Sequence, residues 1–287
     1  MCATLLLMVA SCHAMTELRY PLSSDGVDSR YDYDWAVLRT AMDKTRATYG
    51  RYHQQQSEIA MSPQRVLMEM QSPHGRINIF VRATAPELET QFLPIRLPVD
   101  RGLLGYRLLL IRSADQPRFA RVRTLRDLRA LRAGLGQGWA DVAIFKAAGV
   151  PVVEGNHYDG LFAMLEAGRF DFYSRSADEA VREFAERSGL HPQLAVESTL
   201  LLHYPLPRYF FVRRDAEGEK LARRIRAGME IMLKDGSLQA LFQQHKAKLI
   251  GNTALFKRHI IKLPNPTLSP LTPLGRSEWW FNPLTGQ

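Results

Sequence analysis

Arg175 is the residue whose type and position most clearly suggest chemistry, because a guanidinium at the end of a strand could hold an anionic group. Residues 170–173 (FDFY) are mostly aromatic and follow the turn residue Gly168, a pattern typical of a short strand. Ser176 and Glu179 have the S-x-x-E spacing of a capping box, which predicts a helix start. We therefore expect Arg175 in a strand-to-helix turn, where open α/β sheets bind ligands. The alternative is an arginine that salt-bridges a neighbour or lies in solvent.

A second group of candidate residues lies in the stretch GLGQGWAD. Gln137, Gly138 and Trp139 precede a predicted helix, whose free amides could hold an anion. Trp139 could instead fill the protein interior. The stretch does not indicate a dinucleotide site, because Trp139 stands where the G-x-G-x-x-G pattern requires its third glycine.

Most enzyme signatures are absent from the sequence. It contains no H-E-x-x-H, G-x-S-x-G or P-loop motif. The eight histidines are scattered without the spacing of metal ligands, so we expect neither a metal nor a cofactor. The only cysteines, Cys2 and Cys12, lie in the first 14 residues, and removal of that segment would leave no cysteine nucleophile.

Residues 1–14 (MCATLLLMVASCHA) are apolar, end in small residues and are too short to span a bilayer. We expect a secretory signal peptide that is cleaved after Ala14, although the usual positively charged start is missing. The alternative is lipid attachment at Cys12, because VASC fits the pattern of a lipoprotein cleavage box. In either case the remaining chain has no disulfide.

The 287 residues have an ordinary globular composition, 46% hydrophobic and 23% charged, and could form one large or two medium domains. The net charge is +9, and residues 101–132 alone carry nine arginines against two aspartates. Within RVRTLRDLRALRAG (121–134) the apolar residues share one helical face. This pattern predicts an amphipathic helix with a solvated arginine face and not a nucleic-acid site.

Predicted strands and helices alternate along most of the chain, which favours an α/β fold with parallel strands covered by helices. The expected strands are 17–21, 76–83, 93–98, 105–112, 150–155 and 170–173. The expected helices are 32–45, 62–71, 121–134, 142–149, 158–168, 219–236 and 237–249. After Gly251 five prolines should prevent regular structure, and we expect an extended tail that packs Trp279, Trp280 and Phe281 onto the body.

Several stretches together resemble the bacterial family 3 extracellular solute-binding proteins, the periplasmic receptors of polar amino acid uptake systems. The stretches are LPIRLPVDRGLLGYRLLLIR, TLRDLRALRAGLGQGWADVAIFKAAGVPVVEG, YDGLFAMLEAGRFDFYSR and ALFQQHKAKLI, within a similarity that runs from about Leu18 to Phe281. The resemblance implies the two-lobed α/β fold of type II periplasmic binding proteins, with two hinge strands near 108–111 and 199–204. A ligand cleft would lie between lobe 1, formed by 15–111 and 201–287 with the proline-rich tail 251–287, and lobe 2, formed by 112–200.

The chain departs from the family at both positions that hold the ligand's α-amino and carboxylate groups. The family uses an arginine just after a Thr-Pro-Glu type turn in lobe 1, where this chain has Leu88. It uses an acid after the Gly-Arg-x-Asp strand in lobe 2, where this chain has Ser176. A leucine cannot make a bidentate carboxylate contact and a serine carries no negative charge. We therefore do not expect an ordinary α-amino acid as the ligand.

The resemblance places a different set of polar residues at the expected cleft. They are Ser174, Arg175, Ser176, Gln137, Gly138, Trp139 and Tyr158 from lobe 2, and Tyr20, Arg65, Arg82 and Thr84 from lobe 1. Arg82 is the best second cation of this set, and exposure to solvent is its alternative explanation.

The function that we expect from these features is that of a periplasmic, monomeric solute-binding protein. It would close around a small polar, anionic solute and present the closed form to an ABC transporter permease or a membrane sensor. We expect no nucleic-acid partner. Two alternatives stay open: a periplasmic enzyme of the same fold, similar to cyclohexadienyl dehydratases, and an adaptor derived from the fold that binds no solute.

Overall fold

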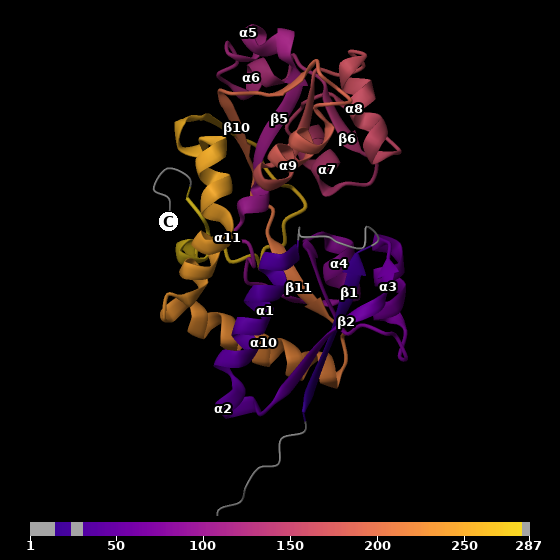
Figure 1. The fold of residues 1–287 in the computed structure, drawn as a ribbon, viewed down its shortest axis with the longest axis vertical. Helices are drawn as coiled ribbons and strands as arrows, with labels where there is room; N and C mark the ends of the chain where they lie inside the picture. Colours follow the sequence, from indigo (N-terminus) through magenta and orange to yellow (C-terminus); the bar gives the residue numbers. More distant parts are fainter. Residues whose placement is uncertain (1–14, 24–30, 283–287) are drawn as a thin grey trace, which may run out of the picture.

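The computed structural model describes residues 15–23 and 31–282, so the expected signal peptide and the alternative lipid attachment at Cys12 lie outside the described residues. Figure 1 shows two lobes stacked along the long axis of the molecule. We call the body around a three-stranded sheet lobe one and the body around a seven-stranded sheet lobe two. No helix in the described ranges is both long and apolar enough to cross a bilayer.

Lobe one has a mixed set of strands. Its three-stranded sheet has the order β3 (Ile79–Ala83), β11 (Arg208–Val212), β4 (Leu93–Ile95), and both pairings are antiparallel. The expectation of parallel strands is therefore wrong here, because β11 returns from lobe two and inserts between the two earlier strands. Beside this sheet β1 (Thr16–Ser23) pairs in parallel with β2 (Tyr52–Met61).

Helices cover lobe one and supply part of its core. They are α1 (Asp32–Lys44), α2 (Arg46–Tyr49), α3 (Pro63–Gln71), α4 (Pro86–Gln91) and α10 (Ala216–Lys234). Trp35 of α1 stacks on Phe210 of β11 with ring centroids 6.2 Å apart. Gly228 of α10 lies against the backbone of Ala41, where a Cβ would collide, so the two helices pack very closely.

The sheet of lobe two has the order β12-β10-β5-β8-β6-β7, and β9 pairs with β5 beside it. The strands are β5 (Tyr106–Arg112), β6 (Ala133–Gly136), β7 (Val152–Gly155), β8 (Phe172–Ser176), β9 (Leu194–Val196), β10 (Leu200–His203) and β12 (His259–Lys262). The flanking helices are α7 (Ala140–Ala147), α8 (Tyr158–Glu166) and α9 (Ala177–Arg187). Phe119, Phe145 and Phe172 are fully buried in the lobe's core.

The arginine-rich stretch does not form the single helix that its periodicity predicts. Within residues 121–134 the only α-helix is the four-residue α6 (Leu125–Leu128), and residues 133–136 form strand β6. Another four-residue helix, α5 (Gln116–Phe119), ends before this stretch. The hydroxyl of Thr124 accepts from the amide of Asp127 at 3.2 Å, and this cap starts α6 near the beginning of the predicted helix. Val122, Leu128 and Leu131 are nevertheless buried, so the predicted separation of apolar and basic faces is confirmed.

The chain first crosses between the lobes in segments 96–105 and 204–207, which join β4 to β5 and β10 to β11. The two crossings touch where the amide of Tyr204 donates to the carbonyl of Gly105 at 3.2 Å, a contact that leaves no room for a Cβ at position 105. The expected hinge stretches 108–111 and 199–204 lie beside these crossings, in or next to the paired strands β5 and β10.

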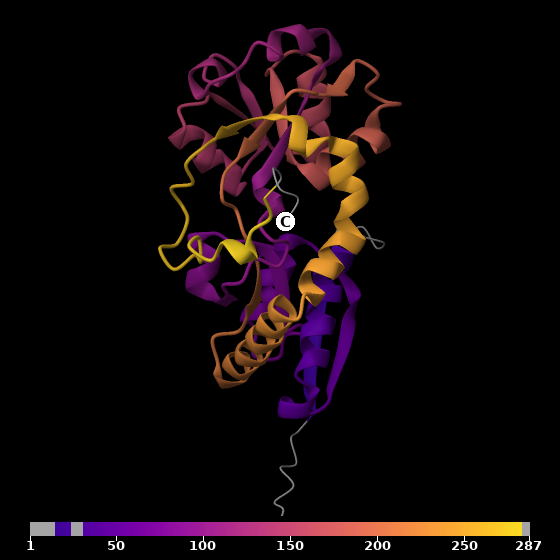
Figure 2. The same cartoon turned by 90° about the vertical axis from the view of Figure 1, so that its left-hand side faces the viewer.

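Residues 237–282 join the lobes twice more, and we call them the C-terminal clasp. Helix α11 (Ser237–Thr253) runs from lobe one toward lobe two, where β12 pairs in parallel with β10, and the tail then returns to lobe one (Figure 2). Trp279 and Phe281 are buried in the core of lobe one, which confirms that prediction. The prediction that no regular structure follows Gly251 is wrong, because β12 completes the edge of the seven-stranded sheet.

Candidate functional site

A cavity of about 1040 Å³ lies between the lobes and is lined by both. Lobe one contributes residues from the start of α3, the end of β3 and the start of α4. Lobe two contributes residues from the starts of α7 and α8 and from along α9. The lining residues used below are Arg82, Leu88 and Arg208 of lobe one, and Arg107, Gln137, Gly138, Trp139, Asp141, Tyr158, Arg175, Glu179, Arg182 and Arg187 of lobe two. We call this cavity the cleft.

Arg175 lies in the cleft wall as part of strand β8, opposite Leu108 of β5, and not in the turn where we expected it. Its Nε and Nη2 donate to the two carboxylate oxygens of Glu183 at 2.7 and 2.6 Å, and Nη2 lies 3.2 Å from Glu179. Burial alone would lower the pKa of Arg175, but the neighbouring carboxylates raise it well above the usual value. The guanidinium is therefore charged and already paired, as in the salt-bridge alternative.

Aromatic rings enclose the same guanidinium. The Cζ atom of Arg175 lies 4.7 Å from the ring centroid of Trp139, 5.3 Å from that of Tyr173 and 5.7 Å from that of Tyr158. Trp139 also covers the backbone of Gly136 so closely that a Cβ there would collide with the indole. Trp139 thus packs into lobe two, as the alternative explanation of its position has it, and it also lines the cleft.

A second buried ion pair supports the floor of the cleft. Arg107 donates through Nη2 to Asp141, and through Nη1 to the carbonyl of Leu104 at 3.1 Å. The hydroxyl of Tyr204 donates to the same carboxylate oxygen of Asp141. The sequence analysis did not identify Arg107 and Asp141, because the two residues are far apart in the chain and form no recognisable motif. It also missed Glu183, which stands one helical turn after Glu179 on the face of α9 that meets Arg175.

Arg82 differs from the other arginines that line the cleft. Arg107, Arg175, Arg182, Arg187 and Arg208 each have a carboxylate oxygen within 4 Å. Within the described part of the chain Arg82 has none: its Nη2 donates to the carbonyl of Pro63 at 3.3 Å, and its Cζ lies 5.7 Å from the ring centroid of Phe80. Burial lowers the pKa of Arg82. A half-buried guanidinium without an anionic partner is suited to bind an anionic group that enters the cleft.

The structure brings six of the eleven sequence-predicted site residues to the cleft lining. They are Arg82, Gln137, Gly138, Trp139, Tyr158 and Arg175. Leu88, at the position of the family's arginine, lines it as well.

The other five predicted residues do not line the cleft, and each has a local contact or is buried. Arg65 pairs with Glu69 at 2.6 Å, and Tyr20 packs against Trp35. The hydroxyl of Thr84 donates to Glu89 at 2.6 Å, and that of Ser176 donates to Asp178 at 2.7 Å. Ser174 is fully buried in β8.

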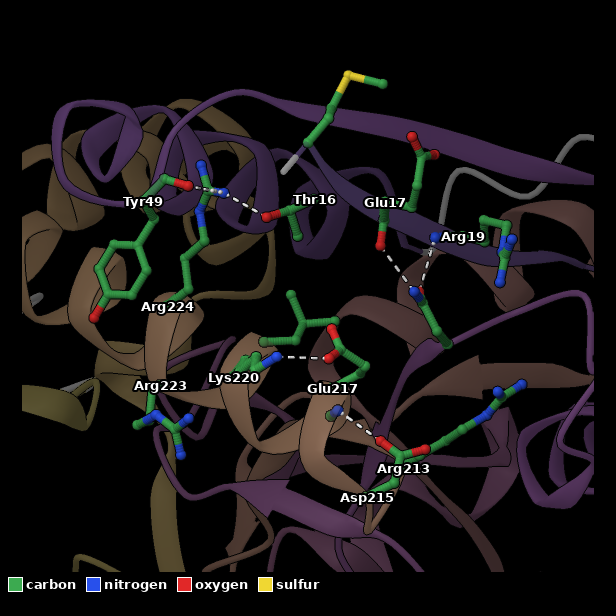
Figure 3. Close-up of a pocket in the computed structure, with 14 residues that line it drawn as sticks. Thr16, Glu17, Arg19, Tyr49, Arg213, Asp215, Glu217, Lys220, Arg223 and Arg224 are labelled. Carbon is green, nitrogen blue, oxygen red and sulfur yellow. Dashed lines mark hydrogen bonds and ion pairs between the residues drawn. The ribbon is translucent and has the colours of Figure 1, made fainter. Parts of the chain in front are cut away.

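A second cavity, of about 650 Å³, lies in lobe one between the start of β1 and helix α10 (Figure 3). Its most buried cation, Arg224, donates to the hydroxyl of Thr16 at 2.7 Å and to the carbonyl of Gly50 at 2.7 Å. Lys220 pairs with Glu217 at 2.7 Å. Arg224 therefore serves to satisfy carbonyls at the end of α2, and the cleft is the better candidate for a binding site.

Solved structures of low sequence identity share the fold. An ancestral arginine-binding protein bound to arginine is 17% identical, with a TM-score of 0.51, over 81% of this chain and 99% of that chain. A histidine kinase sensor domain with similarity to periplasmic binding proteins is 15% identical, with a TM-score of 0.52, over 83% and 97%. A structure concerning glutathione import via GshT and the cystine ABC importer TcyBC of Streptococcus mutans is 12% identical, with a TM-score of 0.53, over 80% and 95%.

No protein-family model and no curated protein sequence matches the chain. The structural likenesses therefore show its fold. The chain has the two-lobed α/β architecture of type II periplasmic binding proteins, as predicted, with helices on both lobes and a cleft between them.

Proposed function

We propose that this protein binds a small polar solute in the cleft and closes the two lobes around it, as a solute-binding protein of the periplasmic type. The observation that carries the proposal is Arg82, a half-buried guanidinium in the cleft lining that has no carboxylate partner in the described part of the chain. The solute would carry an anionic group for Arg82. It would also meet lobe two, where Gln137 and Trp139 line the opposite wall.

The proposed solute is not held as an ordinary α-amino acid. Leu88 is 8% exposed and supplies no charge in the cleft, and the hydroxyl of Ser176 is engaged by Asp178. Arg175, the other cation that the sequence singled out, is already neutralised by Glu183 and Glu179. The anionic group would therefore meet lobe one, and lobe two would contribute hydrogen bonds and aromatic surface.

The proposed setting is outside the cytoplasmic membrane, with residues 1–14 as a signal peptide or an anchor. The inserted lobe would contain the expected residues 112–200 and, in addition, the rest of strands β5 and β10, which pair in the same sheet. The neighbours in fold include a sensor domain and a structure concerning an ABC importer, so a transporter permease and a membrane sensor both suit as the partner. These neighbours support binding of a solute without its chemical conversion.

The experiment is a thermal-shift screen of the full chain against amino acids, organic acids and other small anions. A ligand at a hundred times its dissociation constant stabilises the folded state by about 2.7 kcal/mol, which a melting curve resolves. Arg82→Ala should abolish the shift caused by an anionic hit. Arg39→Ala, which removes an exposed arginine of lobe one, is the matched control and should keep it.

Two results would overturn the proposal. One is the absence of any stabilising solute, which would favour the adaptor alternative. The other is a shift that Arg82→Ala leaves intact. Chemical conversion of a hit during incubation would instead favour the enzyme alternative.

A further inference from the structure

The end of lobe two that lies farthest from lobe one is covered by arginines. Six exposed arginines lie on α5, α6 and the turns beside them, at the upper end of the molecule in both views (Figures 1 and 2). We call them the arginine cap: Arg118, Arg121, Arg123, Arg126, Arg129 and Arg132. None of them lines the cleft.

Within the described residues, most arginines of the cap have no carboxylate partner. Arg118 and Arg132 lie 2.9 and 3.7 Å from carboxylate oxygens of Asp171. The other four, Arg121, Arg123, Arg126 and Arg129, have no carboxylate oxygen within 4 Å in the part of the chain that the structure describes. Residues 116–132 contain six arginines and one acid, Asp127, so their net charge is +5.

Asp127 offsets only one of the six positive charges, and its carboxylate also holds the backbone. Its Oδ2 accepts from the amides of Arg123 and Thr124 at 3.0 and 2.9 Å. These hydrogen bonds lower the pKa of Asp127 and keep the turn between α5 and α6 in shape. The acid therefore stabilises the frame that carries the arginines.

The frame is rigid because its apolar side chains enter the core of lobe two. Phe119, Val122, Leu128 and Leu131 are all buried. The Nε of Arg129 donates to the carbonyl of Ala148 at 2.8 Å, so this side chain is anchored at its base. The cap thus presents guanidinium groups on a fixed surface and exposes no large apolar side chain of its own.

This composition discriminates between kinds of anionic partner. A stable protein interface usually centres on buried aromatic or aliphatic anchors, and a single-stranded nucleic acid needs aromatic rings for its bases. The cap offers neither. A bilayer surface with anionic phospholipids needs neither, because its phosphates form a dense layer that arginines can meet by charge and by bidentate hydrogen bonds.

We propose that the arginine cap docks lobe two onto bilayers that contain anionic phospholipid. The contact is electrostatic, involves no insertion of apolar side chains, and is independent of whether the cleft holds a solute. It is therefore separate from the function proposed above.

The test is co-sedimentation of the full chain with vesicles of phosphatidylcholine alone and of phosphatidylcholine mixed with phosphatidylglycerol. The difference between the two vesicles is the readout, because it removes any contribution of the apolar residues 1–14. The chain should bind the mixed vesicles more tightly, and added salt should weaken that preference. The cap variant replaces Arg121, Arg123, Arg126 and Arg129 with glutamine. Each basic residue near anionic headgroups strengthens binding roughly fivefold, so this variant should lose about a hundredfold or more.

A matched variant separates the cap from net charge. It replaces Arg39, Arg51, Arg76 and Arg226, four exposed arginines of lobe one, with glutamine and removes the same charge. It should keep most of the binding. Equal losses in the two variants, or no preference of the unmodified chain for phosphatidylglycerol, would overturn the proposal. So would competition by glycerol phosphate at concentrations too low to screen charge, because that result would indicate a small-anion site instead of a surface contact.

Discussion

Arg175 and Glu183 meet on the wall of the cleft through two hydrogen bonds of 2.7 and 2.6 Å, with both side chains less than 10% exposed. An arginine that the sequence marks as a ligand contact is therefore part of a buried ion pair. A solute in the cleft would therefore meet Arg175 with its charge already offset, beside the Trp139 ring.

The energetics of this pair can be tested by a double-mutant cycle. Arg175→Leu leaves the buried carboxylate of Glu183 without its partner and should destabilise the fold by about 3–5 kcal/mol. Glu183→Leu should cost less, because Arg175 keeps Glu179 at 3.2 Å. The double variant should lose less than the sum of the two, since the contact between these two side chains is lost only once. Urea unfolding of the four proteins measures the coupling. Additive losses would contradict the pairing.

His203 should make stability depend on pH. Burial, and then the charge of Lys262, lower the pKa of His203 to about 4, and its ring stacks on Tyr106 at 4.3 Å. The unfolded chain binds the proton more tightly, with a pKa of about 6.5, so this contribution to stability is present above that pH and is lost on acidification toward pH 4. The loss should be roughly 1–3 kcal/mol, allowing for the partial exposure of the ring.

The measurement is urea unfolding of the protein and of His203→Gln between pH 4 and pH 7. The variant lacks the titrating group and should show a flatter pH profile in this window. A profile as steep as that of the unmodified protein would assign the acid sensitivity to other groups.

Gly136→Ala should disturb the cleft wall without changing any polar group. The added Cβ would collide with the Trp139 ring, and overpacking of this kind costs about 1–3 kcal/mol. The displaced indole would also leave its place beside Arg175, so tryptophan fluorescence should change together with stability. Gly189→Ala, at an exposed glycine in the turn after α9 where an added Cβ would meet no atom within 4 Å, is the control and should change neither.

Trp279→Ala tests the C-terminal clasp. Trp279 is fully buried in lobe one, and loss of a buried tryptophan costs about 3–5 kcal/mol. If the clasp acts as one unit, release of its tail should also raise the hydrogen exchange of β12 in lobe two. Unchanged protection of β12 would mean that the two attachments are independent. Ile231→Ala, a change at an exposed side chain of α10, should affect neither readout.

The sequence predicts the architecture better than the site. The alternation of strands and helices and the resemblance of connected stretches were enough for a two-lobed α/β fold. The polar strand β2 gave no signal, because QQQSE lacks apolar alternation and the strand is largely exposed. The amphipathic pattern from 121 to 134 concealed one short helix, α6, and the start of strand β6, since helical periodicity cannot show the break made by the Thr124 cap.

The sequence predicted residues of the cleft best where they stand at the start or the end of a strand or helix that the sequence also predicts. Arg82, Trp139 and Tyr158 meet that condition, and all three line the cleft. The state of Arg175 could not be predicted from its own position, because its partner Glu183 follows two helical turns later and its aromatic neighbours come from other elements. Strand β12 in the tail after Gly251 could not be predicted either, since it pairs with β10, a strand nearly 60 residues earlier.

The chain passes between the two halves of this molecule four times, and a rotation that used only segments 96–105 and 204–207 as pivots would pull on the other two passages. Both passages belong to the C-terminal clasp. Its strand β12 pairs with β10 in lobe two, and its Trp279 is buried in the core of lobe one. The angle through which the lobes can open is thus limited by how far residues 254–258 and 263–278 can extend. A mutation in those residues should change how readily a solute enters and leaves without touching the solute itself.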